Sequence, residues 1–536
     1  MLRFTRPGAF NGLQPKFGLS RSLRNLARLA AIGLTLARHD VLFPFAGIPV
    51  VAFFLRFWGL FAHRRGQPAA RPGQRLAAAL DELGPSFVKL GQMLSTRADL
   101  LGDEITADLA SLQDRLPPFP GAAACAAIEA EFAQPLDALF QSFDKAAVAA
   151  ASIAQVHFAC TADGQEVAVK VLRPGVAEAF ARDLDLFLWL ASLLERIQPQ
   201  LRRLKPVEVV RTFAEVVNFE MDLRFEAAAA SELAENFAGD ATFRVPRIDW
   251  SRTGRTVLTL ERIEGVRIDD RAGLLAAGHR IDQVLSKSAG AFFNQVFRDG
   301  FFHADMHPGN MFVDASGAIV VVDFGIMGRL DSPTRWYLAD MLVGFLTGDY
   351  RRVAEVHFAA GYVPSTRSID AFAQACRAIG EPILGRPLHQ ISVARLLAQL
   401  FRVTEQFDME TQPQLLLLQK TMVLVEGVGR RLDPEINIWA MAQPLIERWM
   451  RDNRGPEARL RQRLETIAEM VERLPRLVES LDTLIGEMSR DGVVLHAETI
   501  AAHADEQAKR AYLAVLPLWL AALALVAIAL ALFFRH

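Results

Sequence analysis

Two short polar motifs, close together in the second half of the chain, place the strongest constraint on its fold. The first, HADMHPGN at 303–310, places Asp305 and Asn310 five residues apart, and the second, DFG at 323–325, follows an apolar run. In phosphoryl transfer one aspartate orients the nucleophile, while an asparagine five residues later and the DFG aspartate bind Mg²⁺ on the phosphates. The motifs therefore predict a kinase-like site, with Asp305 as the catalytic carboxylate and Asn310 and Asp323 as metal ligands.

The histidines of the first motif admit a second interpretation. His303, Asp305 and His307 together have the composition of a metal-dependent hydrolase site. That interpretation leaves the DFG motif unexplained. We therefore prefer the kinase-like site and expect His307 to be a structural histidine.

A kinase-like site also requires a lysine on an upstream strand. Alternating β-branched segments at 152–158 and 166–172, separated by a turn at 161–164, predict a β-hairpin. Lys170 lies in the second strand, where it would bind the α- and β-phosphates and pair with a helix glutamate. Further strands are expected at 256–260, 311–313 and 319–322.

The segment before this lysine has alanines where the phosphate loops of protein kinases have glycines. Alanine costs more than glycine wherever φ must be positive, so we expect a stiffer loop that holds the phosphates in a different way. The predicted nucleotide-binding residues of this loop are Val148, Ala149, Ala150, Ala151, Ser152, Ile153, Ala154, Gln155 and Val156.

Acidic partners for Lys170 are expected in the segment NFEMDLRFEA at 218–227. Glu220, Asp222 and Glu226 cannot all face one lysine. If the segment is a single helix, Asp222 and Glu226 share a face and Glu220 lies off it.

In combination these motifs resemble the UbiB/ADCK family, the atypical protein-kinase-like proteins of ubiquinone biosynthesis. The family's KxGQ segment matches 89–92, its alanine-rich loop matches 149–156, its ExD motif matches 220–222, and its helix glutamate matches Glu226. The HADMHPGN and DFG elements match as well. The resemblance covers about residues 75–450.

The resemblance and the terminal segments together predict an α+β, two-lobed protein-kinase-like fold with an N-terminal helical extension and a C-terminal transmembrane helix. The predicted segments are a basic, partly interfacial arm at 1–70, the helical KxGQ extension at 71–147, the N-lobe at 148–265, the C-lobe at 266–450, amphipathic heptad-like helices at 455–510 and the transmembrane helix at 511–534.

The resemblance also implies a regulatory lid over the nucleotide pocket. In that scheme Lys89 contacts the pair Glu220 and Asp222, while Lys170 pairs with Glu226. Lys89 and Gln92 are three residues apart, so both leave one face of a helix. Such a lid would exclude a bulky peptide substrate and leave room for a nucleotide.

The activity implied by the family is ATPase-like or unorthodox kinase activity with ATP and Mg²⁺ that supports ubiquinone biosynthesis at the polyprenylphenol hydroxylation stage. The phosphoryl acceptor stays open between protein, lipid and water. The expected partners are membrane lipids, polyprenylphenol or quinone intermediates and other ubiquinone-biosynthesis proteins, and homo-oligomerisation stays open.

Three other functions are weighed against this one. A small-molecule phosphotransferase of the aminoglycoside/choline kinase kind shares the two acidic motifs but lacks a KxGQ extension and a terminal span. A direct 2-polyprenylphenol hydroxylase that uses flavin would need a GxGxxG fingerprint after a strand, and the chain has none. An inactive scaffold is disfavoured because every predicted phosphate and metal position is filled.

The two ends of the chain predict attachment to a membrane. Residues 511–534 are uncharged and long enough to span a bilayer, and Lys509 and Arg510 before them favour a cytoplasmic body at a bacterial inner membrane. Prolines and Arg56 interrupt the apolar stretch 41–62, so an interfacial segment is preferred there. A mitochondrial transit peptide is the alternative for this arginine-rich, acid-poor arm.

Composition and cysteine spacing disfavour three further classes of protein. Lys and Arg number 59 and Asp and Glu 61, a net charge of −2, which disfavours a nucleic-acid binder. The three cysteines lie far apart in the sequence, which disfavours a disulfide scaffold or a zinc ribbon.

Overall fold

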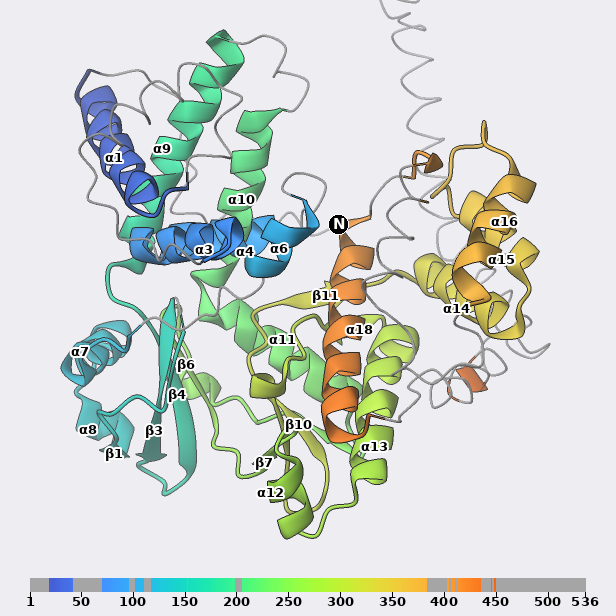
Figure 1. Ribbon diagram of the computed structural model, residues 1–536. Helices are drawn as coiled ribbons and strands as arrows, with labels where there is room; N and C mark the ends of the chain where they lie inside the picture. Colours follow the sequence, from blue (N-terminus) through green and yellow to red (C-terminus); the bar gives the residue numbers. More distant parts are fainter. Residues whose placement is uncertain are drawn as a thin grey trace, which may run out of the picture. The chain divides into compact units, whose positions relative to one another are not determined.

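The computed structural model describes residues 19–41, 70–95, 102–109, 117–151, 153–197, 205–382, 403, 406–409, 412–434, 445 and 448–449 (Figure 1). All of them belong to one compact unit, Met1–Trp449. The predictions for Ser152, most of the stretch 41–62, the heptad segment 455–510 and the membrane span 511–534 fall outside these ranges. Among the helices within the ranges, none has the length and apolar character needed to cross a bilayer. The predicted segment boundaries stay predictions.

A five-stranded antiparallel sheet carries the predicted lysine. Its strands are β1 (Phe140–Phe143), β2 (Ala149–Ala150), β3 (Ala154–Thr161), β4 (Glu166–Leu172) and β6 (Val257–Glu261), in the order β1-β3-β4-β6 with β2 beside β3. The predicted hairpin is confirmed as β3 and β4, which pair with Val156 opposite Lys170. Side chains alternate between the faces of a strand, so Lys170 points away from the buried Val169 and Val171.

Helices precede this sheet in the chain and also connect β4 with β6. They are α1 (Leu19–Arg38), α3 (Pro72–Leu83), α4 (Pro85–Leu94), α6 (Asp103–Leu109), α7 (Gly121–Phe132), α8 (Leu136–Leu139), α9 (Val176–Ile197), α10 (Pro206–Glu220) and α11 (Leu223–Asn236). Gly84 separates α3 from α4, because its φ of 103° lies in the region that favours glycine. α4 packs on α9 through Phe87, whose ring meets Phe187 edge-on at 5.4 Å.

The acidic segment at 218–227 forms two helices, so the shared face of Asp222 and Glu226 expected for a single helix does not apply. α10 ends at Glu220 and α11 starts at Leu223. Between them the Asp222 carboxylate accepts a hydrogen bond from the backbone N–H of Arg224 and caps α11. Aspartate favours this N-cap position because its side chain satisfies an N–H group that has no partner within the helix.

The second half of the unit holds two smaller sheets. One has the order β5-β10-β9-β7 and the other pairs β11 with β8; their strands are β5 (Phe243–Arg244), β7 (Val266–Arg267), β8 (Phe301–His303), β9 (Met311–Val313), β10 (Ile319–Val321) and β11 (Met327–Arg329). The two strands predicted on either side of 314–317 are confirmed as β9 and β10, which pair antiparallel with Ile319 opposite Val313.

The remaining helices are spread along the second half of the chain. They are η3 (Trp250–Arg252), α12 (Arg271–Ala276), α13 (Ile281–Phe293), the π-helical η4 (Asn294–Asp299), η5 (Pro308–Asn310), α14 (Ser332–Thr347), α15 (Tyr350–Ala359), α16 (Ile369–Gly380) and α18 (Pro413–Leu432). Asp305 follows β8 and Asp323 follows β10, and β8 pairs with β11 just after the DFG motif. Short strands thus bring the two acidic motifs together.

Candidate active site

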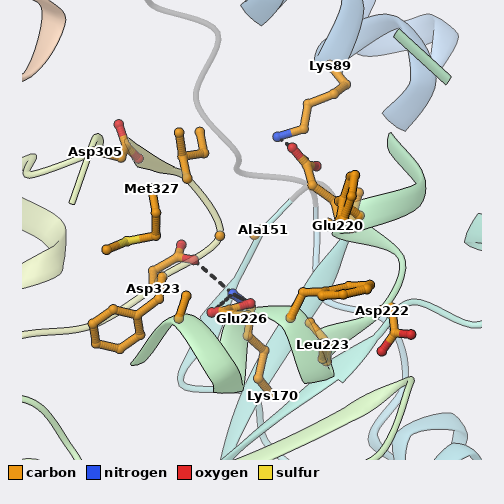
Figure 2. Close-up of a pocket in the computed structure, with 17 residues that line it drawn as sticks. Lys89, Ala151, Lys170, Glu220, Asp222, Leu223, Glu226, Asp305, Asp323 and Met327 are labelled. Atoms are coloured by element: carbon orange, nitrogen blue, oxygen red, sulfur yellow. Dashed lines mark hydrogen bonds and ion pairs between the residues drawn. The ribbon is translucent and has the colours of Figure 1, made fainter. Parts of the chain in front are cut away.

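A charged cluster of three side chains lies at the centre of the site (Figure 2). Nζ of Lys170 lies 2.8 and 3.0 Å from the two carboxylate oxygens of Glu226 and 2.9 Å from Oδ1 of Asp323. These residues come from β4, from α11 and from the turn after β10. The structure therefore brings together the predicted lysine, the predicted helix glutamate and the DFG aspartate.

The two carboxylates beside Lys170 differ in the direction of their pKa shifts and in their exposure. Burial acts to lower the pKa of Lys170, but the nearby Asp323 and Glu226 outweigh it and raise that pKa. Lys170 lowers the pKa of Asp323 despite its desolvation, whereas burial raises the pKa of Glu226 against the pull of Lys170. The Glu226 side chain is 7% exposed and that of Asp323 is 44% exposed. Asp323 is thus the carboxylate that ionises more readily, and it is also more accessible to a ligand than Glu226.

The backbone at Asp323 is held in an uncommon conformation. Its φ is +65°, in the left-handed region that non-glycine residues seldom adopt. The next residue, Phe324, is buried, and its ring centroid lies 5.7 Å from that of His303. Such backbone strain persists where surrounding packing fixes the chain, and it is frequent at functional sites.

His303 holds the loop that carries Asp305. Its Nδ1 accepts a hydrogen bond from the backbone N–H of Asp305 at 3.1 Å, and its Nε2 lies 3.1 Å from the carbonyl oxygen of Val322. Because Nδ1 accepts this hydrogen bond, the ring proton lies on Nε2, which donates to Val322, and burial lowers the pKa of His303. Both ring nitrogens thus contact backbone groups, and this arrangement favours the kinase-like interpretation over the metal-dependent hydrolase.

Asn310 and His307 complete this loop. Nδ2 of Asn310 donates to the carbonyl oxygen of Asp305 at 3.2 Å, so the amide oxygen is the atom that would bind a cation. Nδ1 of His307 accepts from the N–H of Gly309 and caps a short 3₁₀ turn, a structural role. Its Nε2 lies 3.7 Å from Oδ2 of Asp305.

The oxygen donors of Asp323 and Asn310 fit Mg²⁺. This ion prefers oxygen ligands and is usually held by one or two carboxylates together with phosphate oxygens. Within the described ranges, no group of three or more His, Cys, Asp or Glu side chains is arranged to bind a metal ion. Asp323 and Asn310 thus offer oxygen atoms of the type that this ion prefers, and Asp323 is the one of the two that lines the pocket.

A basic side chain that the sequence did not single out also reaches this loop. Nζ of Lys420, from α18, lies 3.0 Å from Oδ1 of Asp305. In the sequence Lys420 is a lone lysine after the run LLLLQ, and no spacing rule links it to Asp305.

The alanine-rich loop is a tight hairpin. Ala149 and Ala150 in β2 pair with Val156 and Gln155 in β3, and the N–H of Ala151 donates to the carbonyl of Ala154. Among the described residues of the loop, none has a positive φ. The alanines therefore carry no conformational strain here.

Only part of the predicted loop faces the pocket. Ala151 and Ile153 line it, together with Lys170 and Asp323. The buried side chain of Gln155 instead binds the backbone of Phe119 in both directions, at 2.9 and 3.2 Å. Gln155 thus fastens the loop base to the preceding linker.

The predicted lid pair is only partly present. Nζ of Lys89, on α4, lies 3.0 Å from Oε2 of Glu220 at the end of α10, and both residues line the pocket. Asp222 binds the guanidinium of Arg224 at 2.9 and 2.7 Å and points away from Glu220 in Figure 2. Burial acts to raise the pKa of Asp222, but the hydrogen bonds from Arg224 lower it. Of the predicted acidic pair, Glu220 contacts Lys89, whereas Asp222 caps α11 and binds Arg224, because the chain breaks the helix between them.

Gln92 lies on α4 three residues after Lys89 and is half-buried. Its backbone carbonyl accepts a hydrogen bond from the hydroxyl of Ser95 at 2.7 Å, which closes the end of the helix.

Comparisons with known proteins give a consistent assignment. The family model of the ABC1 atypical kinase-like domain matches residues 111–357, and that of the UbiB helical domain matches residues 376–437. A relative named "Probable protein kinase UbiB" from Marinobacter nauticus is 43% identical over 464 residues, covering 85% of this chain and 84% of that protein. Another of the same name from Azotobacter vinelandii is 40% identical over 477 residues, covering 88% of each chain.

Among solved structures, the complex of Rv3197 with erythromycin from Mycobacterium tuberculosis is similar, at 25% identity and a TM-score of 0.48, covering 69% of this chain and 94% of that chain. The matched domains include Lys170, Glu226, Asp305, Asp323 and Lys420. The chain therefore belongs to the UbiB family of ABC1 atypical kinase-like proteins and has a protein-kinase-like fold of mixed helix and sheet.

Proposed function

We propose that this protein binds ATP with Mg²⁺ in the pocket around Lys170 and transfers or hydrolyses the γ-phosphoryl group. The observation that carries the proposal is the simultaneous contact of Lys170 with Glu226 and Asp323, in a pocket that Asp305 also lines. A lysine held by a helix glutamate beside a metal-binding aspartate is the arrangement that kinase-like phosphoryl transfer requires.

Each of the pocket's charged and amide side chains would have its own role in the reaction. Lys170, fixed by Glu226, would bind the α- and β-phosphates. Asp323 and Asn310 would hold Mg²⁺, which when bound neutralises charge that develops on the phosphates. Asp305 would orient the attacking hydroxyl or water and take up its proton, and His303 keeps the Asp305 backbone in place.

The proposed role of Asp305 is tested by Asp305→Asn. A general base contributes about 10²–10⁴-fold to turnover, so we expect ATP turnover to fall by that factor while Mg²⁺-ATP binding persists. Asp282→Asn is the matched control, because that aspartate is 64% exposed and pairs only locally with Arg280. Normal turnover in Asp305→Asn would refute the role.

We further propose that the activity supports ubiquinone biosynthesis at the polyprenylphenol hydroxylation stage, on a bacterial inner membrane. Membership of the UbiB family supports the pathway, and the uncharged segment 511–534 supports the location. A strain without this protein should accumulate an early polyprenylated phenol and lack ubiquinone. Wild-type protein and Asp282→Asn should restore the quinone, and Asp305→Asn should not; normal quinone in the deletion strain would contradict the proposal.

A further inference from the structure

Asp305 has a close cationic neighbour that the proposed function does not use. Nζ of Lys420 lies 3.0 Å from Oδ1 of Asp305, whereas Nε2 of His307 lies 3.7 Å from Oδ2. Lys420 is therefore the nearer of the two, and it contacts the carboxylate from 115 residues away along the chain.

The packing of α18 determines where this ammonium lies. Leu418, Thr421, Val425, Val428 and Leu432 are buried, and their spacing of three and four residues gives α18 one buried face. α18 contacts α13 and β11, and it runs alongside α13 in Figure 1. Because β11 pairs with β8, which leads into Asp305, the same packing fixes both members of the ion pair.

The exposure of the pair permits a role beyond stability. The side chain of Lys420 is 39% exposed and that of Asp305 is 25% exposed. An ion pair this exposed contributes little to the free energy of unfolding. It does, however, determine which carboxylate oxygen is held and which can meet a nucleophile.

We infer that Lys420 is a positioning residue for the reaction. By holding Oδ1, it fixes the rotation of the Asp305 carboxylate, so that Oδ2 is the oxygen that meets the proton of the nucleophile. The docking of α18 then becomes a condition for a competent site. This inference rests on the role proposed above for Asp305.

The test compares three variants of the full chain. Lys420→Met keeps the aliphatic stem and removes the charge, and Lys420→Arg keeps the charge. Arg431→Met is the matched control on the same helix, because Arg431 is 66% exposed and pairs with Asp269 at 3.5 Å. For each variant kcat, KM for ATP, equilibrium Mg²⁺-ATP affinity and the thermal midpoint are measured.

Misplacement of a catalytic group can cost up to about 10²-fold, so we expect Lys420→Met to lower kcat by about 10–100-fold. Its nucleotide affinity should stay within about threefold of wild type, because Lys420 acts on Asp305 and not on the nucleotide. Lys420→Arg should recover most of the loss, and Arg431→Met should match wild type. A Lys420→Gln variant repeats the test if the methionine variant has a lowered thermal midpoint.

A double variant separates positioning from a general effect on the helix. If Lys420 acts through Asp305, adding Lys420→Met to Asp305→Asn should lower kcat no further. Additive losses, or an equal loss in Arg431→Met, would overturn the inference. Wild-type kcat in Lys420→Met, together with a lowered kcat in Asp305→Asn, would also overturn the inference. Wild-type turnover in Asp305→Asn itself would instead contradict the proposed function.

Discussion

The ion pair between Lys89 and Glu220 offers the sharpest test of the lid. The two side chains are 13% and 12% exposed, and their charged atoms lie 3.0 Å apart. Lys89→Ala removes the ammonium that lies 3.0 Å from the Glu220 carboxylate, while that carboxylate stays mostly buried. Removing one partner of a fully buried pair costs about 3–5 kcal/mol. Because this pair keeps some contact with solvent, we expect about 1–3 kcal/mol.

That loss should loosen α4 without unfolding the molecule. Phe87 and Val88 on α4 are buried, and the burial of each such side chain stabilises by about 1.5–3 kcal/mol. The apolar contacts of α4 thus exceed the lost ion pair. A shift of 1.4 kcal/mol is a factor of ten, so the open population of the lid should rise by roughly 5–150-fold.

The assay is amide hydrogen exchange of residues 85–94, together with Mg²⁺-ATP affinity and autophosphorylation. Protection of α4 should fall by that factor in Lys89→Ala, and nucleotide handling should change with it. Lys205→Ala is the matched control. Lys205 also pairs with a glutamate, Glu208, at 3.0 Å, but Lys205 is 70% exposed and Glu208 is 63% exposed. If the two variants give the same protection and the same affinity, the lid is ordinary structure and the regulatory reasoning is refuted.

Three further predictions concern the pocket itself. Asp323→Asn should abolish metal-dependent nucleotide binding, which titration with and without Mg²⁺ would show, and unchanged Mg²⁺-ATP affinity would contradict the site. Burial raises the pKa of Glu226 above its ordinary value of 4.5. The contribution of Glu226 to the free energy of unfolding is therefore fully present below pH 4.5 and is lost as the pH rises through the raised pKa. Glu226→Gln should remove that part of the pH slope in denaturant unfolding, and identical slopes would argue against it. Ala150→Gly should add backbone freedom to the alanine-rich loop. Equilibrium binding should then show a change in nucleotide affinity in the same direction as in Lys89→Ala. An affinity equal to wild type would count against a role for the alanines.

The sequence predicted those features that depend on local pattern. The hairpin around Lys170 follows from alternating β-branched residues and a short turn, and its strands lie within a few residues of the predicted bounds. The placement of Asp305 and Asp323 in one pocket could be predicted because the short apolar segments between them favour paired strands, β9 and β10. In each case the residues that make the decisive contacts are close together in the sequence.

The features that the sequence missed depend on competition between local preferences or on distant contacts. At 218–227 the sequence was considered as a single helix, but Asp222 instead caps the start of a second helix and binds Arg224. The contact of Lys420 with Asp305 could not be predicted, because it depends on how α18 packs on β11. A lysine beside an apolar helix stripe is ordinarily only solvated.

Three lysines of the described site come from separate parts of the chain, and each contacts acidic side chains. Lys89 on α4 pairs with Glu220, Lys170 on β4 pairs with Glu226 and Asp323, and Lys420 on α18 pairs with Asp305. A nucleotide polyphosphate would compete with these carboxylates for Lys89 and Lys170, which line the pocket, and Mg²⁺ would compete for the carboxylates. Binding at such a site exchanges ion pairs within the protein for ion pairs with the ligand. Because α4 supplies one of these two cations, loosening α4 should alter the response to nucleotide even when the central pair of Lys170 and Glu226 is intact, whereas loosening α18 should alter turnover through Asp305.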